Sequence, residues 1–212
     1  MEFSGVMGFL KNKDSYWSCR GHEELIIPFD VLPSEYLSYS EYDIESGIEK
    51  RHRLINTLSN AKRSLDCQID SLLIAFGLYG LAKKEKWNIP KKIEKLKELG
   101  IIAPRILNKI NSVRNLVEHK FEVPNEEQVS DFLDVVALFN ASTERYIYDF
   151  PRDSQIENDS IDDLYLDVRF NREESNIKIE ARMNEIYTFI IDSSHDDYIE
   201  FINHYIKKFS KS

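Results

Sequence analysis

The sequence predicts a mainly α-helical protein, an up-and-down bundle of about four helices with a small C-terminal antiparallel α+β unit. Between residues 46 and 149, apolar residues recur three or four positions apart, which is the spacing of amphipathic helices. In residues 162–212 they first alternate with polar residues, as strands require, and then return to helical spacing. Residues 150–161 are rich in Pro, Asp, Asn and Ser, which predicts a linker between the two regions.

The chain has 212 residues and a net charge of −9, and this charge is unevenly distributed. Residues 1–45 and 150–212 each carry a net charge of −6, whereas residues 46–149 carry +3. Because binding to nucleic acids depends on neutralising phosphates, only the middle region is suited to a polyanion.

Several features argue against a membrane, secreted or metal-binding protein. No apolar run approaches the ~18 residues that cross a bilayer. The first ten residues contain an acid and two glycines where a secretory signal has basic residues and a continuous apolar stretch. Cys19 and Cys67 match neither a disulfide framework nor a zinc site, and the histidines are scattered. We therefore expect a cytoplasmic protein without a structural metal or a cofactor.

Residues 1–45 form an N-terminal segment with few clear signals. The apolar run Leu25–Phe29 predicts a short strand, and Pro33 predicts the start of a helix. The segment is therefore expected to precede the helical region without belonging to it.

Glycine, proline and asparagine residues divide the first part of the helical region. The apolar residues from 48 to 76 predict one or two long helices that end near Gly77–Gly80. Asn88, followed by Pro90, predicts the N-terminus of a short helix, and Gly100 predicts its end.

A further pair of helices is predicted on either side of Pro124. The first has a buried stripe with helical spacing, made of Ile106, Ile110, Val113 and Val117. Pro124 disfavours helix in the residue before it, so this helix should end near residues 120–122. Asn125 and Gln128 resemble a capping box for the next helix, which should reach about Tyr148.

The C-terminal region predicts a three-stranded meander and a final helix. Alternation of apolar and polar residues marks strands at Leu164–Phe170 and Ile177–Met183, and a more continuous apolar run marks a third at Ile186–Ile191. The stripe that begins at Tyr198 predicts a helix with acids at its start and lysines at its end. Leu25–Phe29 is a possible additional edge strand.

Seven lysines crowd a fifteen-residue window of the basic region: Lys83, Lys84, Lys86, Lys91, Lys92, Lys95 and Lys97. The first five are candidate substrate-binding residues for a polyanion. The alternative, and the commoner role of such a run, is a solvated helix face.

The main candidate for catalysis is the stretch from Arg114 to His119. It combines a permanent cation, which suits phosphate, with a side chain that exchanges protons near neutral pH. At helical i, i+4 spacing Asn115 is the neighbour of His119, and Arg114 is the neighbour of Glu118. Taken alone, the residues favour the commoner alternative, an exposed Arg114–Glu118 ion pair and a histidine stabilised by the helix dipole.

The run Arg114-Asn115-Leu116-Val117-Glu118-His119 resembles the signature of the HEPN domain family. That signature is an arginine, usually followed by a polar residue, and a histidine after four to six intervening positions. Long helices before and after the motif also resemble the family. The resemblance covers residues 46–149 and does not extend to the N-terminal segment or the C-terminal unit.

The resemblance implies a metal-independent endoribonuclease, of the kind often found as toxins or as effectors in anti-phage and stress systems. It implies that Arg114 stabilises the scissile phosphate, that His119 acts as general acid or base, and that Asn115 positions His119. It also implies RNA as substrate, a homodimer with a composite site, and an antitoxin or regulatory protein as a possible partner.

Two other functions remain open. Some HEPN domains bind nucleotides, RNA or proteins without cleaving RNA, and this chain can be such a module. Alternatively, the protein is a helical dimerisation domain with a small α+β appendage.

Overall fold

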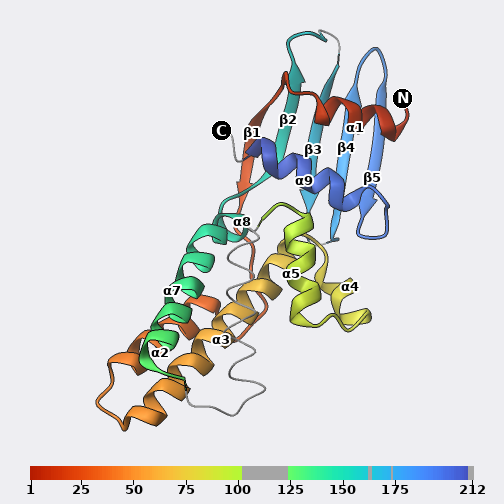
Figure 1. Ribbon diagram of the computed structural model, residues 1–212. Helices are drawn as coiled ribbons and strands as arrows, with labels where there is room; N and C mark the ends of the chain where they lie inside the picture. The colour runs from red at the N-terminus through yellow and green to blue at the C-terminus, as the bar shows by residue number, and fades with distance from the viewer. Residues whose placement is uncertain (102–123, 162–163, 173, 210–212) are drawn as a thin grey trace.

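A five-stranded antiparallel sheet forms one end of the protein, and a group of helices extends from that sheet (Figure 1). The computed structural model describes residues 1–101, 124–161, 164–172 and 174–209. The strands lie in chain order, β1 to β5, so the N-terminal strand pairs with a strand that follows more than a hundred residues later. The strands are β1 Ser15–Glu23, β2 Phe150–Asn158, β3 Tyr165–Asn171, β4 Asn176–Arg182 and β5 Ile186–Asp192.

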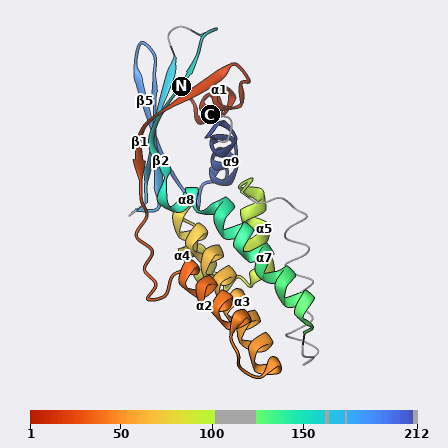
Figure 2. The same ribbon diagram turned by 90° about the vertical axis from the view of Figure 1, so that its left-hand side faces the viewer.

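One face of the sheet is covered by α1 (Phe3–Lys11) and α9 (Tyr198–Phe209), while none of the described helices lies against the opposite face (Figure 2). The sequence alternation of β3 accounts for this: Leu166, Val168 and Phe170 are buried beneath the helices, and the residues between them face outward. Antiparallel sheets commonly keep one face in solvent in this way.

The second group of helices packs around α3, the longest of them. The bounds are α2 Pro33–Glu45, α3 Lys50–Ala75, α4 Tyr79–Lys84, α5 Ile89–Glu98, α7 Glu126–Thr143 and α8 Arg145–Tyr148. Two buried or half-buried hydrogen bonds join α3 to α7: the Gln68 amide donates to the Thr143 hydroxyl, and the Asn140 amide donates to the Ser64 hydroxyl, each at 2.8 Å. These pairs satisfy polar groups that would otherwise be costly to bury between helices.

A row of aromatic rings joins the helices to the sheet. Phe76, at the end of α3, lies 5.5 Å from Phe150 on β2, and Phe150 lies 4.9 Å from Phe170 on β3. Phe170 in turn lies 4.9 Å from Tyr205 on α9. These edge-to-face and tilted contacts each contribute about 0.5 to 1.5 kcal/mol beyond area burial, so the two groups share one core.

The prediction of a mainly α-helical bundle with a small appendage is wrong, because the protein has an α+β fold. The three predicted strands and the final helix are present, but the sheet has two further strands, β1 and β2. Both come from segments for which the sequence predicted no strand, and together they make the sheet a major part of the core.

Two local predictions differ from the structure for identifiable reasons. Leu25–Phe29 is not a strand: it is an extended connection in which Ile26 is 89% exposed, while β1 lies just before it. The expected linker in fact contains β2. The sequence did not predict this strand because its inward face carries the polar residues Ser154 and Asn158, which hide the alternation of apolar and polar residues. These side chains are buried at no great cost, because each is hydrogen-bonded inside the core.

Candidate functional site

The predicted catalytic residues Arg114, Asn115 and His119 lie in residues 102–123, outside the part of the chain that the structure describes. What the structure describes is the chain on either side of them. Helix α5 leads into this segment at Ile101, and the chain continues from Pro124 into α7.

Both described ends of the segment are fixed by specific contacts. Gly100 has a positive φ of +83°, and the backbone N–H of Ile101 donates to the Leu96 carbonyl. The Asn203 amide of α9 donates a 2.7 Å hydrogen bond to the Glu98 carbonyl, which holds the end of α5 against the sheet layer. Gly is the residue that adopts this left-handed helix end without strain, as the sequence predicted.

At the other end, Asn125 and Gln128 form the predicted capping box, with hydrogen bonds of 2.8 and 3.1 Å. Glu126 pairs with Arg53 at 2.5 Å and with Lys50 at 3.4 Å, so the start of α7 is tied to the start of α3. The segment carrying the motif is therefore attached to α5 and α9 at one end and to α3 and α7 at the other.

The five candidate substrate-binding lysines fall into two groups. Lys83 and Lys84 end α4, and Lys86 follows in the turn; all three are exposed. The Lys83 ammonium lies 4.5 Å from the centre of the Tyr79 ring, a cation–π contact that leaves its charge available. Lys84 and Lys86 form no ion pair with any residue that the structure describes.

The other two lysines are neutralised within the protein. Lys92 forms a 2.6 Å ion pair with Asp70 of α3, and both side chains are largely buried, so it holds α5 against α3. Lys91 pairs with Glu94 at 2.8 Å, and this hydrogen bond raises the pKa of the lysine. Of the five candidates, Lys83, Lys84 and Lys86 are therefore the ones whose charge is not paired with a described carboxylate.

The sequence analysis did not find a hollow of about 290 Å³ between the ends of α1 and α9, where cations collect. Lys11 pairs with Glu200 at 2.8 Å, whereas Lys13 and Lys207 have no ion pair with a described residue. Burial and the nearby lysines lower the pKa of His204 at this hollow, so its imidazole is mainly neutral at pH 7. These residues lie far apart in the sequence, and only the packing of α1 beside α9 brings them together.

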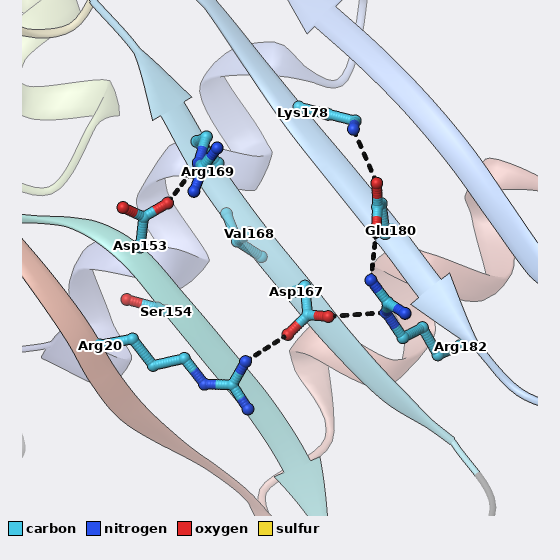
Figure 3. A pocket seen from close by; sticks show the side chains of 9 residues that line it. All are labelled: Arg20, Asp153, Ser154, Asp167, Val168, Arg169, Lys178, Glu180 and Arg182. Atoms are coloured by element: carbon cyan, nitrogen blue, oxygen red, sulfur yellow. Dashed lines mark hydrogen bonds and ion pairs between the residues drawn. The ribbon is translucent and has the colours of Figure 1, made fainter.

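A larger hollow, of about 450 Å³, lies on the uncovered face of the sheet (Figure 3). A chain of ion pairs crosses it from strand to strand. Arg20 contacts Asp167 at 3.3 Å, and Asp167 accepts a 2.8 Å hydrogen bond from Arg182. Arg182 also binds Glu180 at 2.6 Å, and Glu180 binds Lys178 at 2.7 Å.

A second set of charges at the same hollow centres on Asp153, which is bound by Arg169 and, at 2.9 Å, by Arg152. Burial opposes ionisation of Asp153, but the two arginine hydrogen bonds outweigh it and lower the pKa of this carboxyl. The hydrogen bond from Lys178 lowers the pKa of Glu180. The charged groups at this hollow are therefore paired with one another.

This arrangement favours a structural role for the sheet hollow. A general acid or base needs a pKa near the working pH, and the pKa values of the Asp153 and Glu180 carboxyls are lowered away from it. The cross-strand pairs instead align β1 to β4 on the face that is left uncovered by the described helices. The alternation of charged residues in β3 and β4 is the sequence signal that could have indicated this face.

The described residues also bear on metals and membranes. Within residues 1–101, 124–161, 164–172 and 174–209, no cluster of His, Cys, Asp and Glu is arranged to hold a metal ion. None of the helices that the structure describes combines the length and the apolar character needed to cross a bilayer.

Comparisons with models of protein families, with curated protein sequences and with solved structures found no match to this chain. The function is therefore inferred from the chain's own residues.

Proposed function

We propose that the protein is a metal-independent endoribonuclease of the HEPN type, acting in the cytoplasm as a toxin or as an anti-phage or stress effector. The observation that carries this proposal is the run Arg114-Asn115-Leu116-Val117-Glu118-His119 between α5 and α7. Both helices contact α3 through hydrogen-bonded side chains, so the described parts of the chain before and after the motif are held to the same helix.

In the proposed reaction, the chain's own residues supply all the chemistry. Arg114 binds the scissile phosphate and stabilises the charge that develops in the transition state. His119 accepts the proton of the 2′-hydroxyl as that oxygen attacks the phosphorus, or donates a proton to the leaving 5′-oxygen. Asn115, four residues before His119, orients the imidazole, and a second copy of the chain completes a composite site.

The charge distribution limits how RNA approaches. The N- and C-terminal regions are acidic, and of the five candidate lysines Lys83, Lys84 and Lys86, at the end of α4, are exposed and have no ion pair with a described residue. We propose that RNA contacts this end of α4, because these three lysines have no competing ion pair with a described residue, whereas Lys91 is paired with Glu94 and Lys92 with Asp70.

The test is an RNA-cleavage assay with EDTA present, comparing the wild-type chain with His119→Ala. His52→Ala is the matched control, since His52 is an exposed histidine near the start of α3, outside the motif. The proposal expects cleavage by the wild type and by the control, and a loss of at least ~100-fold in His119→Ala. Equal residual cleavage in all three would show a contaminant and overturn the proposal.

The assay also separates the enzyme from a binding module. If the wild type binds RNA without cleaving it, and Arg114→Ala abolishes that binding, the motif is a binding site and the catalytic proposal fails. A cleaving protein should instead show Arg114→Ala weakened mainly in kcat, because a phosphate charge that grows in the transition state is what the arginine stabilises.

A further inference from the structure

The two edges of the sheet differ in how they are protected against pairing with another chain. On β1, the register with β2 shifts between Cys19 and Gly21 and again between Gly21 and His22, and Arg20, an exposed cation, lies within the first of these shifts. Bulges and charges are the usual means by which an edge strand is kept from pairing. The β1 edge is therefore guarded.

The β5 edge has none of these features. Its register with β4 runs without a shift over seven pairs, from Asn176–Asp192 to Arg182–Ile186. Between Ile186 and Ile191 the strand contains no charged residue and no proline. Ile186 and Ile190 are 58% and 65% exposed. In the part of the chain that the structure describes, no further backbone hydrogen bond occupies the outer edge of residues 186–191.

The order of residues in β5 fits a second copy of the same strand. From Ile186 to Ile190 the strand reads aliphatic, aromatic, Thr, aromatic, aliphatic, and this order is the same in both directions. Antiparallel pairing about Thr188 would set Ile186 opposite the partner's Ile190 on the uncovered face, and Tyr187 opposite the partner's Phe189 on the helix-covered face. Cross-strand pairs of this kind are the ones that stabilise sheets.

Neighbouring registers are less favourable. A twofold axis normal to the sheet keeps each face continuous, so paired residues must lie on the same face. The axis therefore lies between one residue and the same residue of the second copy, and a register is named by that residue. An axis through Phe189 would set Ile186 against the carboxylate of Asp192. An axis through Tyr187 would set Phe189 against the carboxylate of Glu185. The axis through Thr188 pairs the five residues Ile186 to Ile190 with one another, and it sets Glu185, which lies in the turn before the strand, opposite Ile191.

We propose that β5 is an interface for a second copy of this chain, forming a continuous ten-stranded sheet about a twofold axis at Thr188. The helices α2, α3 and α7 extend from one end of the sheet (Figure 1), so this axis carries these helices of the two copies to opposite ends of the shared sheet. Helices α1 and α9 of both copies then cover the same face (Figure 2). The proposal does not depend on the ribonuclease motif.

Cysteine cross-linking of the full chain tests both the interface and its register. Thr188→Cys places two thiols opposite each other across the axis, so oxidation or a short bismaleimide should give a covalent dimer. Ile190→Cys places its two copies four residues apart along the strands, about 14 Å, which is out of reach. Mixing Ile186→Cys with Ile190→Cys chains should restore the cross-link. Ser18→Cys, on the guarded edge, and the wild type with its own two cysteines are the controls.

Association in solution gives an independent measurement. Thr188→Lys sets two lysines against each other at the axis and should raise the dissociation constant at least ~10-fold in sedimentation analysis, whereas Ser18→Lys should leave it unchanged. A weak specific contact has a dissociation constant on the order of 1 μM, so a wild type that is still monomeric at about 100 μM would overturn the proposal. So would equal cross-linking at Thr188→Cys, Ile190→Cys and Ser18→Cys, or an association that Thr188→Lys leaves intact. Loss of RNA cleavage in His119→Ala with unchanged cross-linking would keep the two proposals separate.

Discussion

Arg172 is a buried cation at the junction of the sheet and α8, and its side chain is only 3% exposed. Its guanidinium donates a 3.1 Å hydrogen bond to the Tyr146 carbonyl, lies 4.7 Å from the centre of the Phe150 ring, and is 3.7 Å from the Glu23 carboxylate. Burial lowers the pKa of Arg172 to about 10 despite that carboxylate. We predict that Glu23→Gln destabilises the protein strongly, whereas Arg172→Met is nearly neutral.

The magnitude for Glu23→Gln follows from the loss of the compensating charge. Two unit charges about 4 Å apart attract by about 4 kcal/mol at an effective dielectric constant of about 20. The Glu23 side chain is 29% exposed, so water replaces part of this attraction when the charge is removed. We therefore expect Glu23→Gln to lower the free energy of unfolding by about 2 to 3 kcal/mol, because it leaves a buried cation without its partner.

Arg172→Met removes the cation together with its desolvation. The lowering of the pKa of Arg172 to about 10 corresponds to about 3 kcal/mol against the charged form in the folded protein. The substitution loses a charge-assisted hydrogen bond of about 2 kcal/mol and a cation–π contact of about 2 kcal/mol. The methionine sulfur regains about 1 kcal/mol against the Phe150 ring. These contributions nearly cancel.

Urea unfolding followed by circular dichroism measures all four members of the double-mutant cycle. Glu23→Gln should cost about 2 to 3 kcal/mol in the wild-type background and close to nothing in Arg172→Met. Glu94→Gln, which breaks an exposed pair with Lys91, is the control and should leave the midpoint unchanged. A large loss in Arg172→Met, or the same cost of Glu23→Gln in both backgrounds, would refute the reasoning.

Three further predictions concern single side chains. Gly100→Ala should lower the free energy of unfolding by about 1 to 2 kcal/mol, because φ is +83° and the new Cβ would lie 2.9 Å from the Asn203 amide. Gly80→Ala is the control: this residue lies within α4 with open space around it, so the substitution should raise the free energy of unfolding by about 0.5 to 1 kcal/mol. Tyr205→Phe should cost about 1 to 2 kcal/mol in the same urea assay, since it removes a buried hydroxyl that hydrogen-bonds to β2. Burial raises the pKa of the Cys67 thiol to about 11. The rate of its reaction with a disulfide reagent should therefore be low at pH 8 and should increase as the pH approaches 11, whereas rapid reaction at pH 8 in the folded protein would contradict this.

The sequence predicted the helices best where local chemistry decides them. Asn88 accepts a hydrogen bond from the backbone N–H of Lys91 at the start of α5, and Gly100 ends that helix region with a positive φ, as expected. The long α3 ends at Ala75, before Gly77, whose φ of +67° is likewise positive. These signals act within one turn of helix, so they survive in the sequence.

The sheet was underestimated because its missing strands depend on distant partners. β2 buries Ser154 and Asn158. Ser154 accepts a hydrogen bond from Tyr205, more than fifty residues away, and Asn158 donates one to Ser15, more than one hundred residues away. No local pattern marks polar residues that are satisfied in this way. The catalytic residues proposed from the sequence stay a prediction, and the lysine cluster divides into exposed and paired members only through contacts such as Lys92 with Asp70.

The two proposals together make a final prediction about assembly and activity. A HEPN-type composite site needs two motif segments that face one another, but pairing through β5 sends the helices of the two copies to opposite ends of the sheet. The composite site must therefore use a surface other than β5, and a chain with both interfaces would assemble beyond a dimer.

Thr188→Lys should accordingly remove the β5 association and leave metal-independent RNA cleavage at the wild-type rate. Thr188 lies on the edge strand, away from α5 and α7, which precede and follow the motif in the chain. Sedimentation and cleavage measured on the same preparation check this, with His119→Ala as the reverse case: unchanged association and lost cleavage. If Thr188→Lys abolished cleavage in a folded chain, the active unit would depend on the β5 pairing, and the separation of the two interfaces would be wrong.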